Sequence, residues 1–318
     1  MFSTRSMSAV EELRYGGQIF DAHTHVVDIE HLDLMVRIGE RYGVSRSLLI
    51  VHGNSIDAIK RRYADHFLYA KYFSGYLLLS GDVDTAIREV ETLRSEGYSV
   101  AKLHFAPFWR TRNGTLPLNA ISDPRLDPFF EALREHDIPV LVHIADPDTY
   151  YATRYADTEM FGTKDDHISE FEERMDRTQG LRVQVAHFGA QPESHRLANL
   201  GQMFARFPTL HVDTGSARWM ARELGRNPEA SREFVIQHAD RILFGTDCVA
   251  RTPDVSYYEG RYVTERLLFE SLVRDVPLPF NDPDTAGRGG TFINGIGLPD
   301  RVLHRLYWEN AAVLYELE

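Results

Sequence analysis

The amino-acid sequence predicts an α/β fold in which eight strands and their intervening helices close into a single-domain (β/α)8 TIM barrel. Short runs rich in aliphatic and β-branched residues alternate with longer segments of helical period, which is the pattern of successive βα units around a parallel sheet. Eight such runs are expected to be strands: Gln18–Val26, Arg46–His52, Phe67–Ser74, Ser99–Phe105, Ile138–Ile144, Leu181–Phe188, Leu210–Thr214 and Arg241–Cys248.

The segments between the runs carry helix signals. Asp82 is placed to cap a helix whose apolar residues recur at helical spacing from Val83 to Leu93, and Gly97 is placed to end it. Asn227 followed by Pro228 predicts another helix start, and Pro299 with Asp300 predicts the last one. Eight strands with helices between them therefore favour a closed barrel over an open sheet.

Length and loop composition set the expected domain organisation. A (β/α)8 barrel takes about 250 residues, and this chain has 318. We assign the surplus to an N-terminal lead over 1–17 and to an excursion over 251–298, which is expected to cover the barrel mouth or to form a dimer interface. No linker divides the rest, so 18–318 is predicted to be one barrel domain. If the protein forms an oligomer, we expect a homodimer.

Charge and cysteine content exclude several classes of function. The formal net charge is -12 and the pI is about 5.6, which disfavours nucleic acid and anionic membranes as partners because phosphate groups bind basic faces. No stretch approaches the ~18 apolar residues of a spanning helix, and 1–17 lacks the apolar centre of a secretory signal. The single cysteine, Cys248, fits a reducing compartment. We therefore expect a cytoplasmic protein.

Four of the predicted strands carry candidate metal ligands near their carboxyl ends. His23 and His25 are two residues apart, so in an extended chain both side chains project from one face. His143, His187 and Asp247 end later apolar runs in the same way. Because the carboxyl ends of all strands meet at one mouth of a barrel, these five side chains are expected to converge.

Histidine and carboxylate ligands suit one divalent ion, with zinc preferred and manganese as the alternative. Such an ion lowers the pKa of its bound water from about 15.7 towards about 7, which makes hydroxide available near neutral pH. For His187, the residues leave ligation and general-base catalysis both open. His52 and His104 also lie at strand ends, where a packing role and a substrate contact are both open.

With these residues the chain resembles the amidohydrolase superfamily, in particular its amidohydrolase-related branch of metal-dependent hydrolases, lactonases and non-oxidative decarboxylases. The matching motifs are Asp21-Ala-His23-Thr-His25, His143, His187, Gly245-Thr246-Asp247 and, near the C-terminus, Trp308-Glu309-Asn310-Ala311-Ala312. The resemblance implies a distorted (β/α)8 barrel. It also implies that His23, His25, His143 and Asp247 bind one divalent ion while His187 positions or deprotonates the attacking water.

Lys102 decides between one ion and two. It lies on the fourth predicted strand, where two-metal members of the superfamily carry a carbamylated bridging lysine. We prefer a lysine that pairs with a substrate carboxylate, because an isolated buried charge is costly and needs a partner. A structural ion pair is the alternative.

Loops that follow the strands are expected to bind the substrate, because they surround the mouth of a barrel. Arginine binds carboxylate through two hydrogen bonds, so the sequence predicts an aromatic and cationic pocket. Its candidate residues are His104, Trp109, Arg110 and Arg251, with 146–154, Arg218, Trp219 and Arg222 as further contributors.

Three functions follow from the residues and the resemblance. The first is a metal-dependent hydrolase, in which metal-activated water attacks a small amide, lactone or related carbonyl compound and His187 or Asp247 moves the proton. The second is a metal-dependent non-oxidative decarboxylase of a small carboxylated substrate. The third, from another class, is a non-catalytic metal-containing binding protein.

Overall fold

The computed structural model describes residues 12–53, 56–112, 118 and 120–317. The chain divides into two compact units, called unit 1 and unit 2 below. Unit 1 comprises Met1–Phe67, Pro192–Leu197 and Asp213–Glu318, and unit 2 comprises Leu68–Gln191 and Ala198–Val212. Among the helices in the described ranges, none combines the length and the apolar character that crossing a bilayer requires.

Parallel strands around β1 form the centre of unit 1. β1 (Ile19–Val26) pairs in parallel with β2 (Val44–Val51) and, through its last residues, with β9 (Cys248–Ala250). The amide of Ala22 also donates to the carbonyl of Phe244, directly after β8 (Ile242–Leu243), at 2.8 Å. β1 is buried along its whole length except at His25, as expected of a central strand in an α/β fold.

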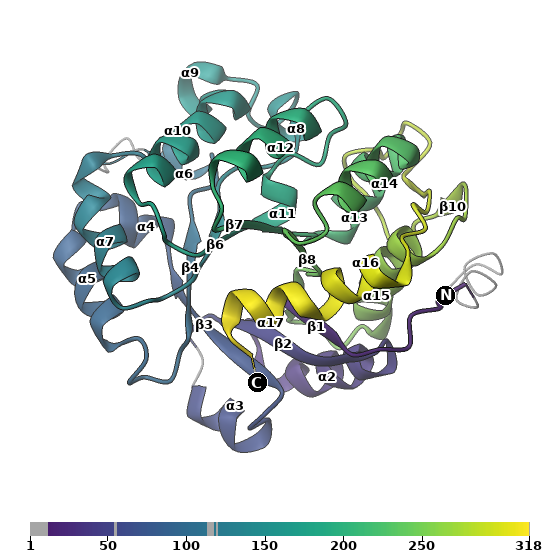
Figure 1. Ribbon diagram of the computed structural model, residues 1–318, viewed down its shortest axis with the longest axis horizontal. Coiled ribbons are helices and arrows are strands. Elements are labelled where there is room, and N and C mark those ends of the chain that lie inside the picture. The colour runs from purple at the N-terminus through teal and green to yellow at the C-terminus, as the bar shows by residue number, and fades with distance from the viewer. Residues whose placement is uncertain (1–11, 54–55, 113–117, 119, 318) are drawn as a thin grey trace. The chain divides into compact units, whose positions relative to one another are not determined.

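The C-terminal helices of unit 1 fix the strand that leads to Asp247. A π-helical turn, Arg305–Glu309, lies between α16 (Asp300–His304) and α17 (Asn310–Tyr315) (Figure 1). The carbonyl of Leu306 accepts from the Phe244 amide at 2.8 Å, and the Asn310 side chain donates to the carbonyls of Ala239 and Ile242, both at 2.7 Å. The asparagine of the C-terminal motif is thus a structural residue.

The other helices of unit 1 pack around these strands. α15 (Val255–Glu270) contacts both α2 (Leu32–Arg41) and α13 (Ala217–Glu223). The remaining elements of this unit are the 3-10 helices Ile29–His31 and Leu224–Arg226, α3 (Ile56–Arg62), α14 (Pro228–Gln237) and the antiparallel pair β10 (Val276–Pro277) and β11 (Phe292–Ile293).

Unit 2 contains five parallel strands that pair in chain order. They are β3 (Phe67–Phe73), β4 (Val100–His104), β5 (Val140–His143), β6 (Val183–Val185) and β7 (Leu210–Asp213). The first residue of β3, Phe67, and the last residue of β7, Asp213, belong to unit 1. The register places His104 opposite His143 at the carboxyl ends of β4 and β5.

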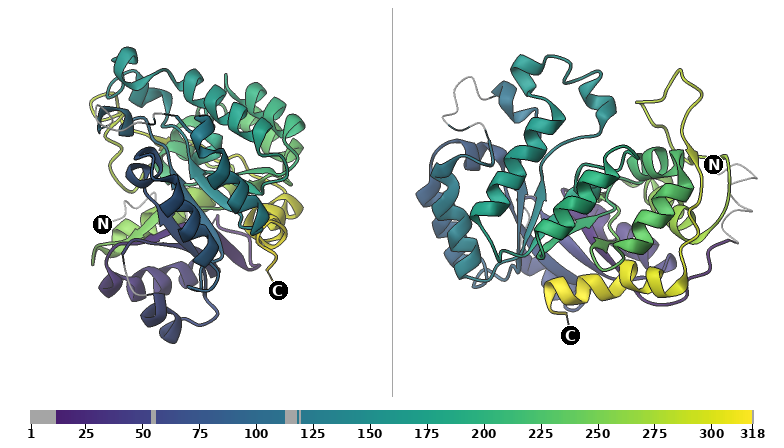
Figure 2. Two further views of the ribbon diagram at one scale, coloured as in Figure 1. Left: turned by 90° about the vertical axis from the view of Figure 1, so that its left-hand side faces the viewer. Right: turned by 45° about the horizontal axis from the view of Figure 1, so that its top comes forward.

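Helices connect consecutive strands of unit 2. α5 (Val83–Thr92) and α7 (Asp127–Glu135) pack side by side (Figures 1 and 2). Asp82 caps α5 as predicted, since its side chain accepts from the Thr85 amide at 3.1 Å. The other helices are α4 (Gly75–Leu79), α6 (Trp109–Arg112), the 3-10 helix Pro124–Leu126, α8 (Asp148–Tyr151), α9 (Thr158–Phe161), α10 (Lys164–Arg177), α11 (Ala186–Gly189) and α12 (Leu197–Arg206).

All eight predicted runs contain a strand, but the sixth and the eighth strands end well before the predicted boundary. The sixth strand stops at Val185, and His187 lies in a turn with a left-handed backbone, φ 58°. The eighth run divides into β8 and β9, and Asp247 lies between them at φ 53°. A left-handed residue cannot continue a strand, and nothing in the apolar pattern reveals it.

The predicted lead and the predicted excursion are described only in part or take on secondary structure of their own. Of the predicted lead 1–17, residues 1–11 lie outside the described ones, and the amides of Arg14 and Tyr15 donate to the Glu270 carboxylate. The excursion 251–298 holds α15, which begins at Val255, and the β10–β11 pair. Its role as a lid or dimer interface, and the single domain over 18–318, stay predictions.

Candidate metal centre

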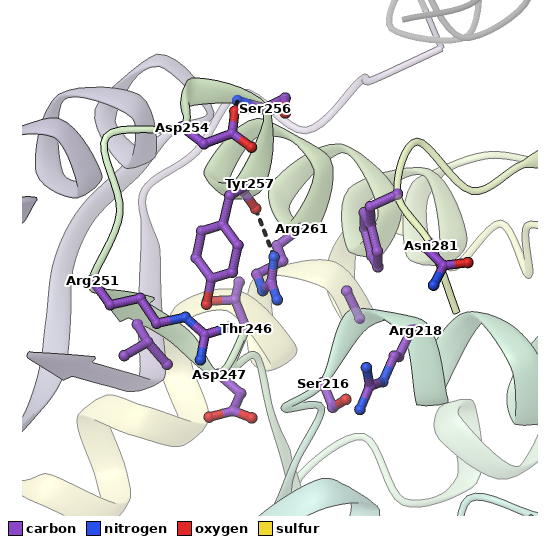
Figure 3. A pocket seen from close by; sticks show the side chains of 13 residues that line it. Ser216, Arg218, Thr246, Asp247, Arg251, Asp254, Ser256, Tyr257, Arg261 and Asn281 are labelled. Carbon is purple, nitrogen blue, oxygen red and sulfur yellow. Dashed lines mark hydrogen bonds between the residues drawn. The ribbon is translucent and has the colours of Figure 1, made fainter. Parts of the chain in front are cut away.

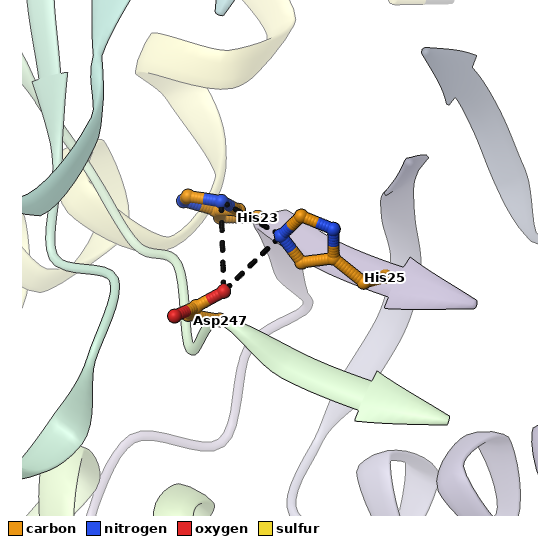
Figure 4. A group of neighbouring side chains, drawn as sticks. All are labelled: His23, His25 and Asp247. Atoms are coloured by element: carbon orange, nitrogen blue, oxygen red, sulfur yellow. Dashed lines mark hydrogen bonds and ion pairs between the residues drawn. The ribbon is translucent and has the colours of Figure 1, made fainter. Parts of the chain in front are cut away.

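Three predicted ligands of unit 1 point at one another. His23 Nε2 lies 3.2 Å from His25 Nε2, and Asp247 Oδ1 lies 3.7 Å from the first and 3.1 Å from the second of these nitrogens (Figure 4). Ligand atoms of a tetrahedral zinc, at about 2.1 Å from the metal, are about 3.4 Å apart. The separations therefore fit three ligands of one small divalent ion.

Both imidazoles are held from their other nitrogen. His23 Nδ1 donates to Asp213 Oδ2 at 3.0 Å, and because a carboxylate only accepts, His23 Nε2 of the neutral ring carries a lone pair. His25 Nδ1 lies 2.8 Å from Nε2 of His52. Lone pairs and a carboxylate that face one another repel unless a cation lies among them, so the donor set suits a metal ion.

The turn that presents Asp247 is fixed by buried polar contacts. Asp21 accepts from the Thr246 hydroxyl at 2.6 Å and from the Thr246 amide at 3.0 Å. Burial raises the pKa of Asp21 to about 7, although these hydrogen bonds act in the opposite direction. Gly245 is required by close approach, since a Cβ there would lie 2.9 Å from the Cβ of His23.

The buried carboxyl group of Glu265 also supports the turn that presents Asp247. The Thr214 hydroxyl lies 3.1 Å from Glu265 Oε2, and it accepts from the Gly245 amide at 3.0 Å. Burial raises the pKa of Glu265 well above its ordinary value. A neutral carboxyl can donate to the threonine oxygen, which leaves the threonine hydroxyl to donate to the Gly245 carbonyl at 3.0 Å.

A pocket of about 420 Å³ adjoins the metal centre within unit 1, and Asp247 belongs to both (Figure 3). Two predicted pocket residues, Arg218 and Arg251, line it together with Arg261, Tyr257 and Phe280. Its volume lies in the range of sites for small molecules. The side chain of Asp247 is 33% exposed, so a carboxylate oxygen can reach a molecule held there.

The other predicted histidines gather in unit 2. His187 Nε2 lies 3.0 Å from His143 Nδ1, and His143 Nε2 lies 3.3 Å from Asp146 Oδ1. Although burial opposes it, the electrostatic attraction of His143 lowers the pKa of Asp146 below its ordinary value. Trp109 Nε1 donates to His104 Nδ1 at 2.8 Å. Their predicted roles in one site with His23 stay predictions.

Several predicted substrate-binding residues have partners within their own unit. Arg110 forms an ion pair with Glu170, and Arg222 is buried between Glu223, Asp282 and Asp284 at 2.6 to 3.0 Å. Lys102 is 2% exposed on β4. The contacts of Arg222 make it a link between α13 and the excursion, while the substrate roles of Lys102, His104, Trp109 and Arg110 stay predictions.

Three contributors to the site, Asp213, Tyr257 and Arg261, did not emerge from sequence. Asp213 is the last residue of β7, and its position after the apolar residues of the seventh predicted run was the available signal. The sequence places His52 at a strand end but does not predict its contact with His25. Tyr257 and Arg261 are four residues apart on α15, a spacing that places two side chains together on a helix.

A family model described as Amidohydrolase matches residues 75–317. No protein of curated function matches the sequence.

Solved structures resemble this chain over most of its length at low identity. A proposed amidohydrolase from Staphylococcus aureus is 13% identical with a TM-score of 0.58, covering 94% of this chain and 100% of that one. A 2,6-dihydroxybenzoate decarboxylase in complex with 2,6-dihydroxybenzoate is 14% identical with a TM-score of 0.53, covering 95% and 99%. A 5-carboxyvanillate decarboxylase from Novosphingobium aromaticivorans, complexed with manganese and 4-hydroxy-3-methoxy-5-nitrobenzoic acid, is 14% identical with a TM-score of 0.52, covering 95% and 97%. This similarity confirms the predicted fold class, a distorted (β/α)8 TIM barrel.

Proposed function

The chain belongs to the amidohydrolase family, and we propose that it is a metal-dependent hydrolase of a small amide, lactone or related carbonyl compound. One observation carries the proposal. The Nε2 atoms of His23 and His25 and Oδ1 of Asp247 all lie within 3.7 Å of one another.

Bound among these atoms, a divalent ion would polarise a substrate carbonyl and supply hydroxide near neutral pH. Zinc suits two imidazoles and a carboxylate, and manganese is the alternative. Residues of the chain orient the two histidine ligands. Asp213 and His52 hold the rings of His23 and His25 so that both Nε2 atoms face Asp247.

Asp247 has a second task in this proposal. Its Oδ1 faces the histidines, and its side chain also borders the pocket. In the proposed reaction, Asp247 Oδ2 accepts a proton from the attacking water and passes it to the leaving group. His143 as a further ligand and His187 as an alternative base keep the roles predicted from sequence.

The test is metal removal followed by turnover assays on a panel of esters, lactones and amides. We expect turnover to disappear with chelation, to return with zinc or manganese, and to be lost in His23→Ala. His136→Ala, which removes an exposed histidine directly after α7, is the matched control and keeps full activity. Full activity of the metal-free protein or of His23→Ala would contradict the proposal.

A second candidate is a non-oxidative decarboxylase, which the two decarboxylases of similar fold favour. The same residues would hold the ion, so the ligands do not separate the two reactions. The products do: carbon dioxide release without net addition of water identifies decarboxylation, and addition of water without carbon dioxide identifies hydrolysis. Ligand binding without turnover on either panel would identify a binding protein instead.

A further inference from the structure

The pocket beside Asp247 contains three guanidinium groups from three different segments. Arg218 comes from α13, Arg251 follows β9, and Arg261 comes from α15 (Figure 3). The pocket has two acidic residues. Asp247 is shared with the proposed metal ion, and Asp254 caps α15, where it accepts from the amide and hydroxyl of Ser256 at 2.9 and 2.7 Å. Cationic charge therefore dominates the space between the arginines.

Aromatic rings organise two of these arginines. The Cζ atom of Arg261 lies 3.6 Å from the centre of the Tyr257 ring, and the Cζ atom of Arg251 lies 5.0 Å from it. Arg261 Nη1 also donates to the carbonyl of Tyr257 at 2.7 Å, and the Phe280 ring lies 5.4 Å from the same guanidinium. Cation–π contacts of this kind hold a guanidinium without neutralising its charge.

The Tyr257 hydroxyl adds a neutral donor. Burial raises the pKa of Tyr257 to about 12, so the phenol keeps its proton at neutral pH. In Figure 3 this hydroxyl points toward the end of the pocket where Asp247 lies.

The charge of Arg251 and Arg261 contrasts with that of two other arginines in the described part of the chain. Arg222 contacts three carboxylates and Arg266 pairs with Glu270, so their charges are neutralised within the fold. Over the part of the chain that the structure describes, neither Arg251 nor Arg261 forms an ion pair with a carboxylate. Two like charges held beside one ring repel each other, and an anion between them relieves this repulsion.

We propose that Arg218, Arg251, Arg261 and Tyr257, together called the arginine pocket, bind a carboxylate of the substrate that is retained in the product. This inference rests on the proposed function, because it places a remote carboxylate beside a carbonyl that the metal centre hydrolyses. The substrate class is thus a small amide or lactone that carries a second, unreactive carboxylate.

The retention of this carboxylate follows from charge. A carboxylate that leaves as carbon dioxide loses its negative charge in the transition state. Guanidinium groups that bind the charged ground state more tightly than that transition state slow the reaction. A hydrolysed carbonyl gains negative charge instead, while the remote carboxylate keeps its own, so binding there aids positioning at no cost to the chemical step.

The experiment measures carboxylate binding to the metal-loaded protein by calorimetry. The probes are succinate and benzoate, with the neutral benzamide and inorganic phosphate beside them. We expect both carboxylates to bind, benzamide not to bind, and phosphate to bind more weakly. Arg251→Gln and Arg261→Gln should each weaken carboxylate binding about 10-fold or more, because each removes a charge-assisted bidentate contact. The double variant should abolish binding.

The matched control is Arg134→Gln on α7, which removes one exposed arginine outside the pocket and should bind both carboxylates like the parent. Unchanged carboxylate affinity in the double variant, with its fold and metal content intact, would overturn the inference, as would phosphate binding tighter than that of either carboxylate. Tyr257→Phe keeps the ring and should retain most of the affinity, whereas Tyr257→Leu should lose it.

Turnover separates this inference from the proposed function. If metal removal leaves turnover intact while the arginine variants still lose carboxylate binding, the proposed function fails and the arginine pocket stands. If turnover is metal-dependent but neutral substrates react as fast as carboxylated ones in both parent and double variant, the arginine pocket fails alone. Where both hold, the double variant should raise KM for carboxylated substrates about 10- to 100-fold, whereas Arg134→Gln should keep the parental KM.

Discussion

The Nδ1 atom of His23 donates to Oδ2 of Asp213 across 3.0 Å, with 1% and 0% of the two side chains exposed. A hydrogen bond to a carboxylate sets the tautomer of a histidine and directs its other nitrogen. Here it directs His23 Nε2 toward His25 and Asp247. Asp213 touches no substrate in this account, yet the orientation of the first ligand depends on it.

Asp213→Asn is therefore expected to weaken metal binding about 10- to 100-fold, the usual effect of removing such a partner. The amide has no charge to stabilise the Nδ1 proton, and its NH2 group faces the ring in one of its two orientations. Metal titration of the apoprotein measures the change. Asp240→Asn, which removes a carboxylate that is 61% exposed, serves as control. Equal affinity in Asp213→Asn and the parent would contradict the orienting role.

Gly245→Ala tests the tight packing behind the ligands. The added methyl group would lie 2.9 Å from the Cβ of His23 and 3.3 Å from that of Asp213, so one of these residues must move. We expect a loss of about 1–3 kcal/mol in the free energy of unfolding and a lower metal affinity. Gly16→Ala is the control, since no atom lies within 4 Å of its added Cβ. Denaturant unfolding and metal titration with parental values for Gly245→Ala would refute the argument.

His187→Asn separates the two roles that the sequence leaves open for this residue. Removal of a general base lowers kcat by about 10²–10⁴ and leaves the metal in place. Removal of a ligand lowers metal content as well. We expect the first outcome, measured by elemental analysis together with kcat. A variant depleted of metal would assign His187 to the ligands instead.

The stability of unit 2 should depend on pH through His167. Burial lowers the pKa of this residue to about 4, and its Nε2 donates to the Phe161 carbonyl at 2.8 Å. The unfolded chain binds a proton below about 6.5, whereas the folded chain does so only near 4. The free energy of unfolding therefore falls as pH drops through this window, by at most about 3 kcal/mol.

His167→Gln keeps a donor for Phe161 but does not titrate. Urea unfolding of parent and variant at pH 7 and pH 5 should show a smaller loss of stability for the variant. Equal losses in the two proteins would show that His167 is not the group responsible.

Strand geometry explains why the sequence predicts the proximity of His23 and His25 that the structure shows. Side chains alternate along β1, which places His23 and His25 on one face. The apolar run before Gly245 predicts the strand that leads to Asp247. The turn itself was not predictable, because the left-handed backbone of Asp247 leaves no mark on hydrophobic periodicity. His187 was assigned to a strand for the same reason.

Contacts between residues that are distant in sequence could not be predicted either. Asp213 is 190 residues from His23, and a Val-Asp pair at the end of a strand does not indicate which histidine it will hold. Arg218 and Arg251 were expected at the pocket because they follow strands. Arg261 and Tyr257 lie on α15, in the excursion that the barrel pattern does not explain, so only the fold shows their place beside Arg251.

The most direct test of the metal centre is calorimetric titration of the apoprotein with zinc and with manganese, for the parent, His25→Ala and His136→Ala. We expect tight binding of an ion to the parent and to His136→Ala, and loss of that tight binding in His25→Ala. An ion bound with parental affinity by a folded His25→Ala variant would contradict it.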